Sequence, residues 1–302
     1  MKIELKQIDE INCQCLLAEN PIWDHQLNVM SWIDIEAGTF YRYNLNDKQY
    51  KQYKLPHRIG SYGLTQKVDI IVAAFDIGIA FCNLKTKALE WLAQPESHLP
   101  YTRFNDGRVD TKGRFWAGTM VEPDKAPCDT EALEQGSLYC VEIDRQCKPI
   151  LNDISISNGL CWSPDSKIMF HADSPHRRVT RYEFDEDTAQ LSNACLYIDT
   201  TNKGFPDGSV CDRYGRYWHA RWADSSVVCI DKDGTELTRI ELPVTQVSSV
   251  AIGGPKMDLM FVTSASIGLD NEAQAKQVKA GNVFIFQLNE SIGVKENICK
   301  IC

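Results

Sequence analysis

The stretch Asp110-Thr111-Lys112-Gly113-Arg114-Phe115-Trp116-Ala117-Gly118 joins a polar turn to a run of aromatic and small residues. A turn followed by such a run is typical of a β-strand. The same order recurs along the chain, with central strands predicted around Trp32, Val72, Trp116, Phe170, Trp218 and Phe261. Their spacing of roughly 40 to 54 residues is that of blades with several strands each. The sequence therefore predicts an all-β fold, a six-bladed β-propeller with a central channel.

Further strands are predicted after each central strand. Residues 39–43 and 179–182 alternate apolar and polar side chains, as strands on one face of a blade do. A fourth strand is expected in residues 87–92 and 236–242. Helical periodicity is nearly absent, and no linker rich in Pro, Gly or Ser divides the chain. We therefore expect residues 1–302 to form a single domain, in which the first strand or strands close the ring against the last blade.

Composition excludes several classes of partner. Hydrophobic residues make up 43% of the chain and charged residues 24%, which is enough for a large core and ordinary for a soluble globular protein. The formal net charge of -9 argues against a nucleic-acid partner, because phosphate binding needs a basic surface. No polybasic cluster or run of about 18 apolar residues indicates a membrane partner. The N-terminus lacks the apolar core of a signal peptide, so we expect a cytoplasmic protein.

The twelve cysteines are expected to be free thiols that mostly behave as small hydrophobes. Cys299 and Cys302 have C-x-x-C spacing at the end of the chain. No second pair accompanies them, so we predict no metal or redox role.

Polar residues stand where a propeller would bring them together. Residues just before or within the first strand of each blade converge at one mouth of the channel. Oxygen donors occupy such positions at Glu19, Asn105, Asp106, Asn158 and Asp207. Two carboxylates and an amide would suit a divalent cation. Asp-Gly and Asn-Gly are also common turn dipeptides, so a purely structural reading stays open, and we interpret Asp106 and Asp110 as structural.

Four motifs resemble one family, that of gluconolactonase, regucalcin and the luciferin-regenerating enzyme. The first is Arg103-Phe104-Asn105-Asp106-Gly107-Arg108-Val109-Asp110 with the strand that follows it. The others are residues 18–23, 157–165 and 204–212. The resemblance extends from the first predicted blade to the last. It implies a six-bladed propeller lactonase with one divalent metal ion in its channel.

The resemblance also implies roles for individual residues. Carried over by matching motif, Glu19, Asn158 and Asp207 would bind the metal. Arg103 and Asn105 would contact the substrate, and Glu122 would be a further substrate-binding carboxylate. Asp207 would also act as the base. Because coordination lowers the basicity of a carboxylate, another carboxylate is the alternative base. The ligands leave Ca, Zn, Mg, Mn and Fe(II) open.

The predicted reaction is metal-dependent hydrolysis of a sugar-acid lactone, such as glucono-, xylono- or arabinono-lactone, to the free aldonic acid. A divalent cation can polarise the carbonyl and activate water, and a carboxylate can accept the proton. Arg103 and Asn105 can hydrogen-bond hydroxyls or the developing oxyanion. The predicted partner is thus a small sugar lactone, and the oligomeric state is left open.

Two other functions compete with this prediction. A non-catalytic calcium-binding or scaffold propeller has no need of the converging polar residues. An esterase- or phosphotriesterase-like hydrolase would act on a hydrophobic substrate, which Arg103, Asn105 and Glu122 disfavour. His171 and His219 are predicted to be packed and hydrogen-bonded rather than ligands. The irregular segment 122–135 is either a lid over the mouth or a surface insertion.

Overall fold

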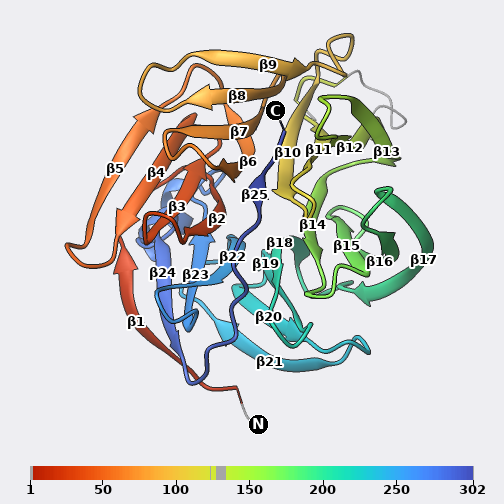
Figure 1. Ribbon diagram of the computed structural model, residues 1–302. Helices are drawn as coiled ribbons and strands as arrows, with labels where there is room; N and C mark the ends of the chain where they lie inside the picture. Colours follow the sequence, from red (N-terminus) through yellow and green to blue (C-terminus); the bar gives the residue numbers. More distant parts are fainter. Residues whose placement is uncertain (1–2, 123, 127–133, 302) are drawn as a thin grey trace.

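The computed structural model describes residues 3–122, 124–126 and 134–301. These residues form six sheets arranged around a central axis, each with four antiparallel strands, which confirms the predicted six-bladed β-propeller (Figure 1). The strands of blades 1 to 3 are β2 (Ala18–Asp24), β3 (Val29–Asp34), β4 (Thr39–Asn44) and β5 (Gln49–Lys54); β6 (Ile59–Thr65), β7 (Ile70–Phe75), β8 (Gly78–Asn83) and β9 (Leu89–Ala93); and β10 (Thr102–Val109), β11 (Phe115–Val121), β12 (Gly136–Val141) and β13 (Cys147–Ile154).

Blades 4 to 6 follow in the same order. Their strands are β14 (Ser157–Trp162), β15 (Ile168–Asp173), β16 (Arg178–Asp185) and β17 (Gln190–Asp199); β18 (Phe205–Cys211), β19 (Tyr217–Trp222), β20 (Ser226–Ile230) and β21 (Glu236–Glu241); and β22 (Val247–Gly253), β23 (Leu259–Ser264), β24 (Val283–Leu288) and β1 (Leu5–Ile11). Each predicted central strand is the second strand of its blade. The one α-helix in the described ranges, α1 (Asn271–Lys276), lies between β23 and β24.

The N-terminal strand completes the last blade, as predicted. β1 pairs antiparallel with β24, from Leu5 opposite Leu288 to Ile11 opposite Val283. This pairing joins the two ends of the ring through backbone hydrogen bonds.

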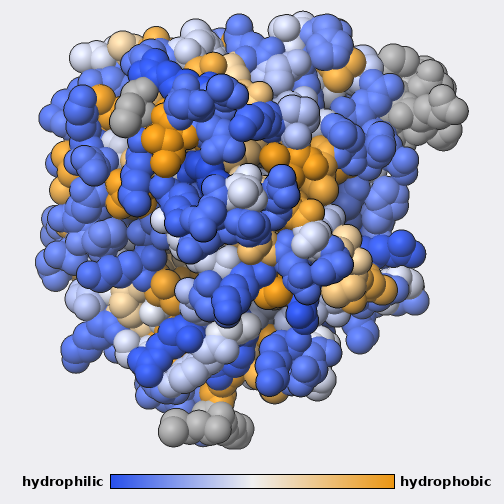
Figure 2. Space-filling model, turned by 45° about the vertical axis from the view of Figure 1, so that its right-hand side comes forward, coloured by the Kyte–Doolittle hydropathy of each residue, from blue (hydrophilic) through white to orange (hydrophobic). Residues whose placement is uncertain are grey.

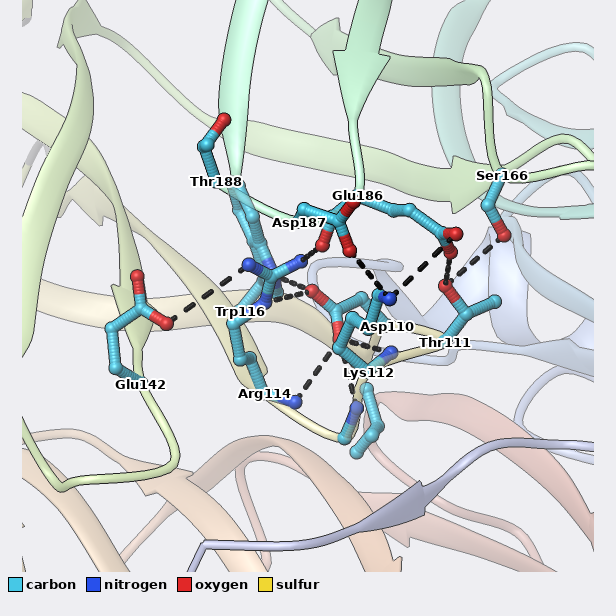
Figure 3. A network of polar contacts seen from close by, with 12 residues as sticks. Asp110, Thr111, Lys112, Arg114, Trp116, Glu142, Ser166, Glu186, Asp187 and Thr188 are labelled. Atoms are coloured by element: carbon cyan, nitrogen blue, oxygen red, sulfur yellow. Dashed lines mark hydrogen bonds and ion pairs between the residues drawn. The ribbon is translucent and has the colours of Figure 1, made fainter.

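An aspartate at the end of an inner strand anchors the turn and the second strand of its blade. Asp110 accepts hydrogen bonds from the backbone N of Gly113 and Arg114, from Arg114 Nε at 2.6 Å and from Trp116 Nε1 at 2.9 Å (Figure 3). Lys112 in this turn pairs with Asp187 of blade 4 at 2.7 Å. The structural interpretation of Asp110 is therefore confirmed.

Blade 5 repeats this arrangement. Asp212 accepts from Arg216 Nε at 2.6 Å and from Trp218 Nε1 at 2.9 Å. Trp116 and Trp218, like Trp32 of blade 1, are fully buried between blades. These side chains remove large apolar areas from water, which is the main stabilising contribution in such a fold.

The C-terminal segment covers one end of the channel. β25 (Ile298–Cys299) pairs in parallel with β6, and the chain that leads to it crosses the middle of the ring (Figure 1). Glu296 forms a bidentate ion pair with Arg108, at 2.9 and 2.6 Å, and Asn297 Nδ2 donates to Val109 O at 3.1 Å. Val109 is the last residue of β10, so this segment lies where the inner strands end.

The ten described cysteines are free thiols, as predicted. Cys299 is buried in β25, and Cys302 lies outside the described residues. No helix in the part of the chain described above is long and apolar enough to cross a membrane. On the face shown in Figure 2, hydrophilic residues predominate and apolar ones form small separate groups.

Candidate active site

The predicted site residues stand near the beginning of the inner strands, opposite the end that the C-terminal segment covers. Glu19 and Asn158 are the second residues of β2 and β14, and Asp207 is the third residue of β18. Arg103 and Asn105 lie in the first half of β10. The structure therefore gathers residues from blades 1, 3, 4 and 5 at one mouth of the channel.

A β-bulge lies at each of these positions. The register between the first and second strand shifts at Glu19/Ile22, Phe104/Gly107, Asn158/Cys161 and Pro206/Ser209. A bulge adds a residue to one strand, bends it and changes the direction of its side chains. Here the bulges interrupt the strict alternation of the inner strands beside the site residues.

Gly159 shows why the bulge in β14 needs a residue without a Cβ atom. Its φ of +60° lies in the left-handed region, which glycine adopts without steric cost. A Cβ atom there would lie 2.7 Å from the Tyr217 hydroxyl and 3.2 Å from the carbonyl oxygen of Asp207. The glycine thus lets β14 approach β18 closely, and this brings Asn158 and Asp207 together.

Three carboxylates share the mouth, of which Asp207 is buried and Glu19 and Asp106 are partly buried. Burial, with a contribution from the charge of Asp106, raises the pKa of Glu19 to about 8. Burial and then the charges of Glu19 and Asp106 hold the pKa of Asp207 well above its ordinary range. This mutual repulsion means that the three groups lie within electrostatic range of one another. In the described structure, none of the three accepts a hydrogen bond from a Lys or Arg side chain.

Asp106 caps a turn, as predicted from the sequence, and also contacts residues of two other blades. Its Oδ1 accepts a hydrogen bond from the adjacent Gly107 N at 2.8 Å, as a turn cap would. Its Oδ2 accepts from Leu160 N of blade 4 at 2.9 Å, and Asn20 Nδ2 of blade 1 lies 3.4 Å from Oδ1. Asp106 therefore links three blades and adds a third carboxylate to the site.

Arg103 and Asn105 form one hydrogen-bonded unit. Arg103 Nη1 donates to Asn105 Oδ1 at 2.9 Å and to Phe104 O at 3.0 Å. Asn105 Nδ2 donates to Ser157 O of blade 4 at 2.9 Å. Arg103 is 6% exposed, and its Nε has no hydrogen-bond partner among the described residues. A buried cation with unused donors is able to bind an uncharged oxygen-rich ligand or a developing negative charge.

Glu122 lies beside Arg103 in a group of basic side chains. Its Oε1 is 2.7 Å from Arg58 Nη1 and 3.7 Å from Arg103 Nε, and its Oε2 is 2.5 Å from Lys125 Nζ. Burial raises the pKa of Glu122, but the hydrogen bonds from Arg58 and Lys125 outweigh it and lower the pKa to about 2. Glu122 is therefore ionised at neutral pH.

The sequence matches a family of known proteins over most of its length. The family described as "SMP-30/Gluconolactonase/LRE-like region" matches residues 17–266. The chain belongs to this family. It is 34% identical over 277 residues to human regucalcin, with 90% of each chain covered. It is 33% identical over 275 residues to the 6-deoxy-6-sulfogluconolactonase of Pseudomonas putida, which covers 91% of this chain and 92% of the relative.

Solved structures agree with this assignment to the SMP-30/gluconolactonase family. A luciferin-regenerating enzyme superposes with a TM-score of 0.89 at 29% identity and covers 99% of both chains. A calcium-binding regucalcin from Agrobacterium tumefaciens has a TM-score of 0.88 at 29% identity and covers 97% of both. The family predicted from the four motifs is thus confirmed.

The predicted ligand set at the mouth consists of oxygen donors, which suit a hard cation. Glu19, Asn158 and Asp207 offer only oxygen atoms when they act as ligands. A divalent ion among the carboxylates would offset the loss of hydration and the mutual repulsion that raise the pKa values of Glu19 and Asp207. Within the ranges that the structure describes, no group of three or more His, Cys, Asp or Glu is arranged to hold a metal ion. Glu19, Asp106 and Asp207 are therefore not arranged as such a group by themselves, and the role of Glu19, Asn158 and Asp207 as a ligand set stays a prediction.

His171 and His219, the two histidines of the central strands, are buried, as predicted. His171 Nε2 lies 2.9 Å from Ser157 Oγ, and burial lowers the pKa of His171 to about 4. His219 is fully buried and its Nε2 lies 3.4 Å from Arg221 Nε. The two interpretations of segment 122–135 are not separated, because residues 123 and 127–133 lie outside the described part.

Proposed function

We propose that the protein hydrolyses the lactone of a sugar acid to the free aldonic acid, with a divalent cation bound at the mouth of the channel. The observation that carries the proposal is the convergence of three carboxylates, one buried and two partly buried, and Asn158 with the Arg103–Asn105 pair. A structural propeller gains nothing from burying like charges together, because their repulsion destabilises the fold. Membership of the family supports hydrolysis of an ester bond as the reaction.

The residues divide into two groups. Glu19, Asn158 and Asp207 would hold the cation, which supplies Lewis acidity toward the lactone carbonyl and water. Asp207 is the proposed base, because burial beside Glu19 and Asp106 raises the proton affinity of its carboxylate, which accepts the proton in its ionised form. Coordination would oppose that effect, so another of the three carboxylates is the alternative.

The second group would bind the substrate. Arg103 and Asn105 would donate hydrogen bonds to ring hydroxyls or to the oxygen on which negative charge develops. Glu122, held ionised by Arg58 and Lys125, can only accept hydrogen bonds, which suits a hydroxyl donor. A polyhydroxylated lactone such as glucono-, xylono- or arabinono-lactone offers both kinds of partner.

The decisive experiment measures acid release from a panel of aldonolactones in a pH-stat. The protein is treated with a chelator and then loaded singly with Ca, Mg, Mn, Zn or Fe(II), and spontaneous hydrolysis is subtracted. We expect a rate well above background with one lactone and at least one metal. Retained metal binding without any such rate would favour a non-catalytic metal-binding protein; the regucalcin from Agrobacterium tumefaciens is described as a calcium-binding protein. We further propose that this reaction takes place in the cytoplasm.

A further inference from the structure

Arg58 is a side chain at the mouth that none of the motifs includes. It precedes β6, the inner strand of blade 2, and its side chain is 24% exposed. Its Nη1 donates to Glu122 Oε1 at 2.7 Å and its Nη2 donates to Glu122 Oε2 at 3.0 Å. Two parallel hydrogen bonds from a planar guanidinium fix both the distance and the plane of a carboxylate.

Arg58 is itself held from two sides. Its Nη1 lies 3.4 Å from Glu36 Oε2, in the turn between β3 and β4 of blade 1. Its Nε lies 3.7 Å from Asp76 Oδ2 of blade 2, and its carbonyl oxygen accepts from Asp76 N at 2.9 Å. Contacts from blades 1 and 2 therefore aim the guanidinium at Glu122 of blade 3.

Among the described residues, no other side chain would orient Glu122 in a comparable way without Arg58. Arg103 Nε lies 3.7 Å from Glu122 Oε1, beyond hydrogen-bond distance. Lys125 Nζ is closer, at 2.5 Å, but the lysine side chain is 52% exposed and its ammonium group acts as a point charge that does not fix the carboxylate plane.

We propose that Arg58 is a positioning residue for substrate binding, which holds the Glu122 carboxylate in the plane and place where it accepts a hydroxyl of the lactone. This inference rests on the proposed function and adds to it a residue that does not touch the substrate. The surrounding group contains three cations, Arg58, Arg103 and Lys125, and three anions, Glu36, Asp76 and Glu122. Its charges therefore balance, which suits a neutral polyol better than a lactone with an additional anionic group.

The test compares steady-state kinetics of R58M, R58K and the wild-type protein on the lactone that the panel identifies. We expect R58M to raise KM about tenfold and to change kcat less than about twofold, because lost positioning weakens binding of ground state and transition state alike. R58K keeps the charge without the bidentate geometry, so we expect a KM between those of R58M and wild type. Because R58K keeps the cation, it also serves as the variant with the least effect on folding.

A double-mutant cycle with Glu122 distinguishes positioning from general support of the fold. If Arg58 acts through Glu122, R58M in the E122Q background raises KM no further than E122Q alone. R239M is the matched control, because Arg239 also contacts two carboxylates and is 27% exposed, but it lies on β21, the outer strand of blade 5. We expect R239M to leave KM unchanged.

Two results would overturn the inference: an R58M variant with the KM of wild type, or additive effects of R58M and E122Q. Failure of the proposed function is distinguishable, since it would appear as absence of lactonase activity in the wild-type protein. That result would also remove the basis for a positioning role.

Discussion

At the scale of single residues, the proposed reaction depends on a few carboxylates at the mouth of the channel. Substitution of one of them tests its role directly. Asp207→Asn keeps the shape of the side chain but removes the acceptor of the proton. We expect it to lower kcat about 100-fold or more with a saturating metal, while circular dichroism shows a folded propeller. Asp187→Asn is the control, since Asp187 is exposed and contacts Lys112 far from the mouth. Full activity of Asp207→Asn would refute both roles proposed for this residue.

Glu122 allows a prediction about acid stability. Its pKa in the folded protein is about 2, below the ordinary value of 4.5. A group with a lowered pKa stabilises the folded state above its unfolded pKa, and this contribution is lost as the pH falls from about 4.5 to about 2. Urea unfolding of wild type and E122Q should therefore differ most near neutral pH and converge toward pH 2. A difference that stays constant over this range would contradict the ion pairs seen with Arg58 and Lys125.

At the scale of elements, the bulge in β14 should be sensitive to a single methyl group. Gly159→Ala introduces both a left-handed alanine and a clash with Tyr217 and Asp207. Gly215→Ala is the matched control, because its φ is +77° and the nearest atom would lie 3.9 Å away. We expect G215A to cost about 1 kcal/mol of stability and G159A about 2 to 3 kcal/mol. G159A should also lower lactonase activity about tenfold; equal effects of both variants would show that the approach of β14 to β18 is unimportant.

The elements also show how far the sequence can predict this fold. The second strand of each blade was recognisable because Trp32, Trp116 and Trp218 stand at similar places after polar turns. The hydrogen bonds of Asp110 and Asp212 to the following arginine and tryptophan explain why that pattern recurs. The bulges were not predictable as such, because a shift of register depends on the partner strand, and the sequence indicated only glycines near polar residues.

At the scale of the whole molecule, the ring is closed by an element far away in sequence. Deletion of residues 1–11 removes β1 and exposes the edge of β24, including Val283 and Phe284. An unpaired edge strand pairs readily with another chain. We expect this variant to unfold at a lower temperature and to form larger species in size-exclusion chromatography. Lys6→Gln, at an exposed position of β1, keeps the strand and should behave as wild type. Identical melting of the deletion variant and Lys6→Gln would show that β1 does not stabilise the ring.

The site residues likewise divide into those that sequence motifs identify and those that depend on contacts between blades. The motifs identified the six predicted site residues, and the structure places them around one mouth because each blade begins there. The second function of Asp106 and the existence of Arg58 could not be read from the sequence. Both depend on contacts between different blades, such as Asp106 with Leu160 and Arg58 with Glu122, and a residue that acts across blades has no partner at a recognisable spacing.

The pairing of β1 with β24 has a consequence for how the protein is made. The ribosome synthesises β1 first, but its partner Val283–Leu288 emerges only after five blades are complete. A nascent chain therefore carries an unpaired first strand through most of its synthesis, while its other blades pair locally. Contacts between such distant residues form slowly. Ring closure is thus a late step, which has to wait until β24 has been synthesised.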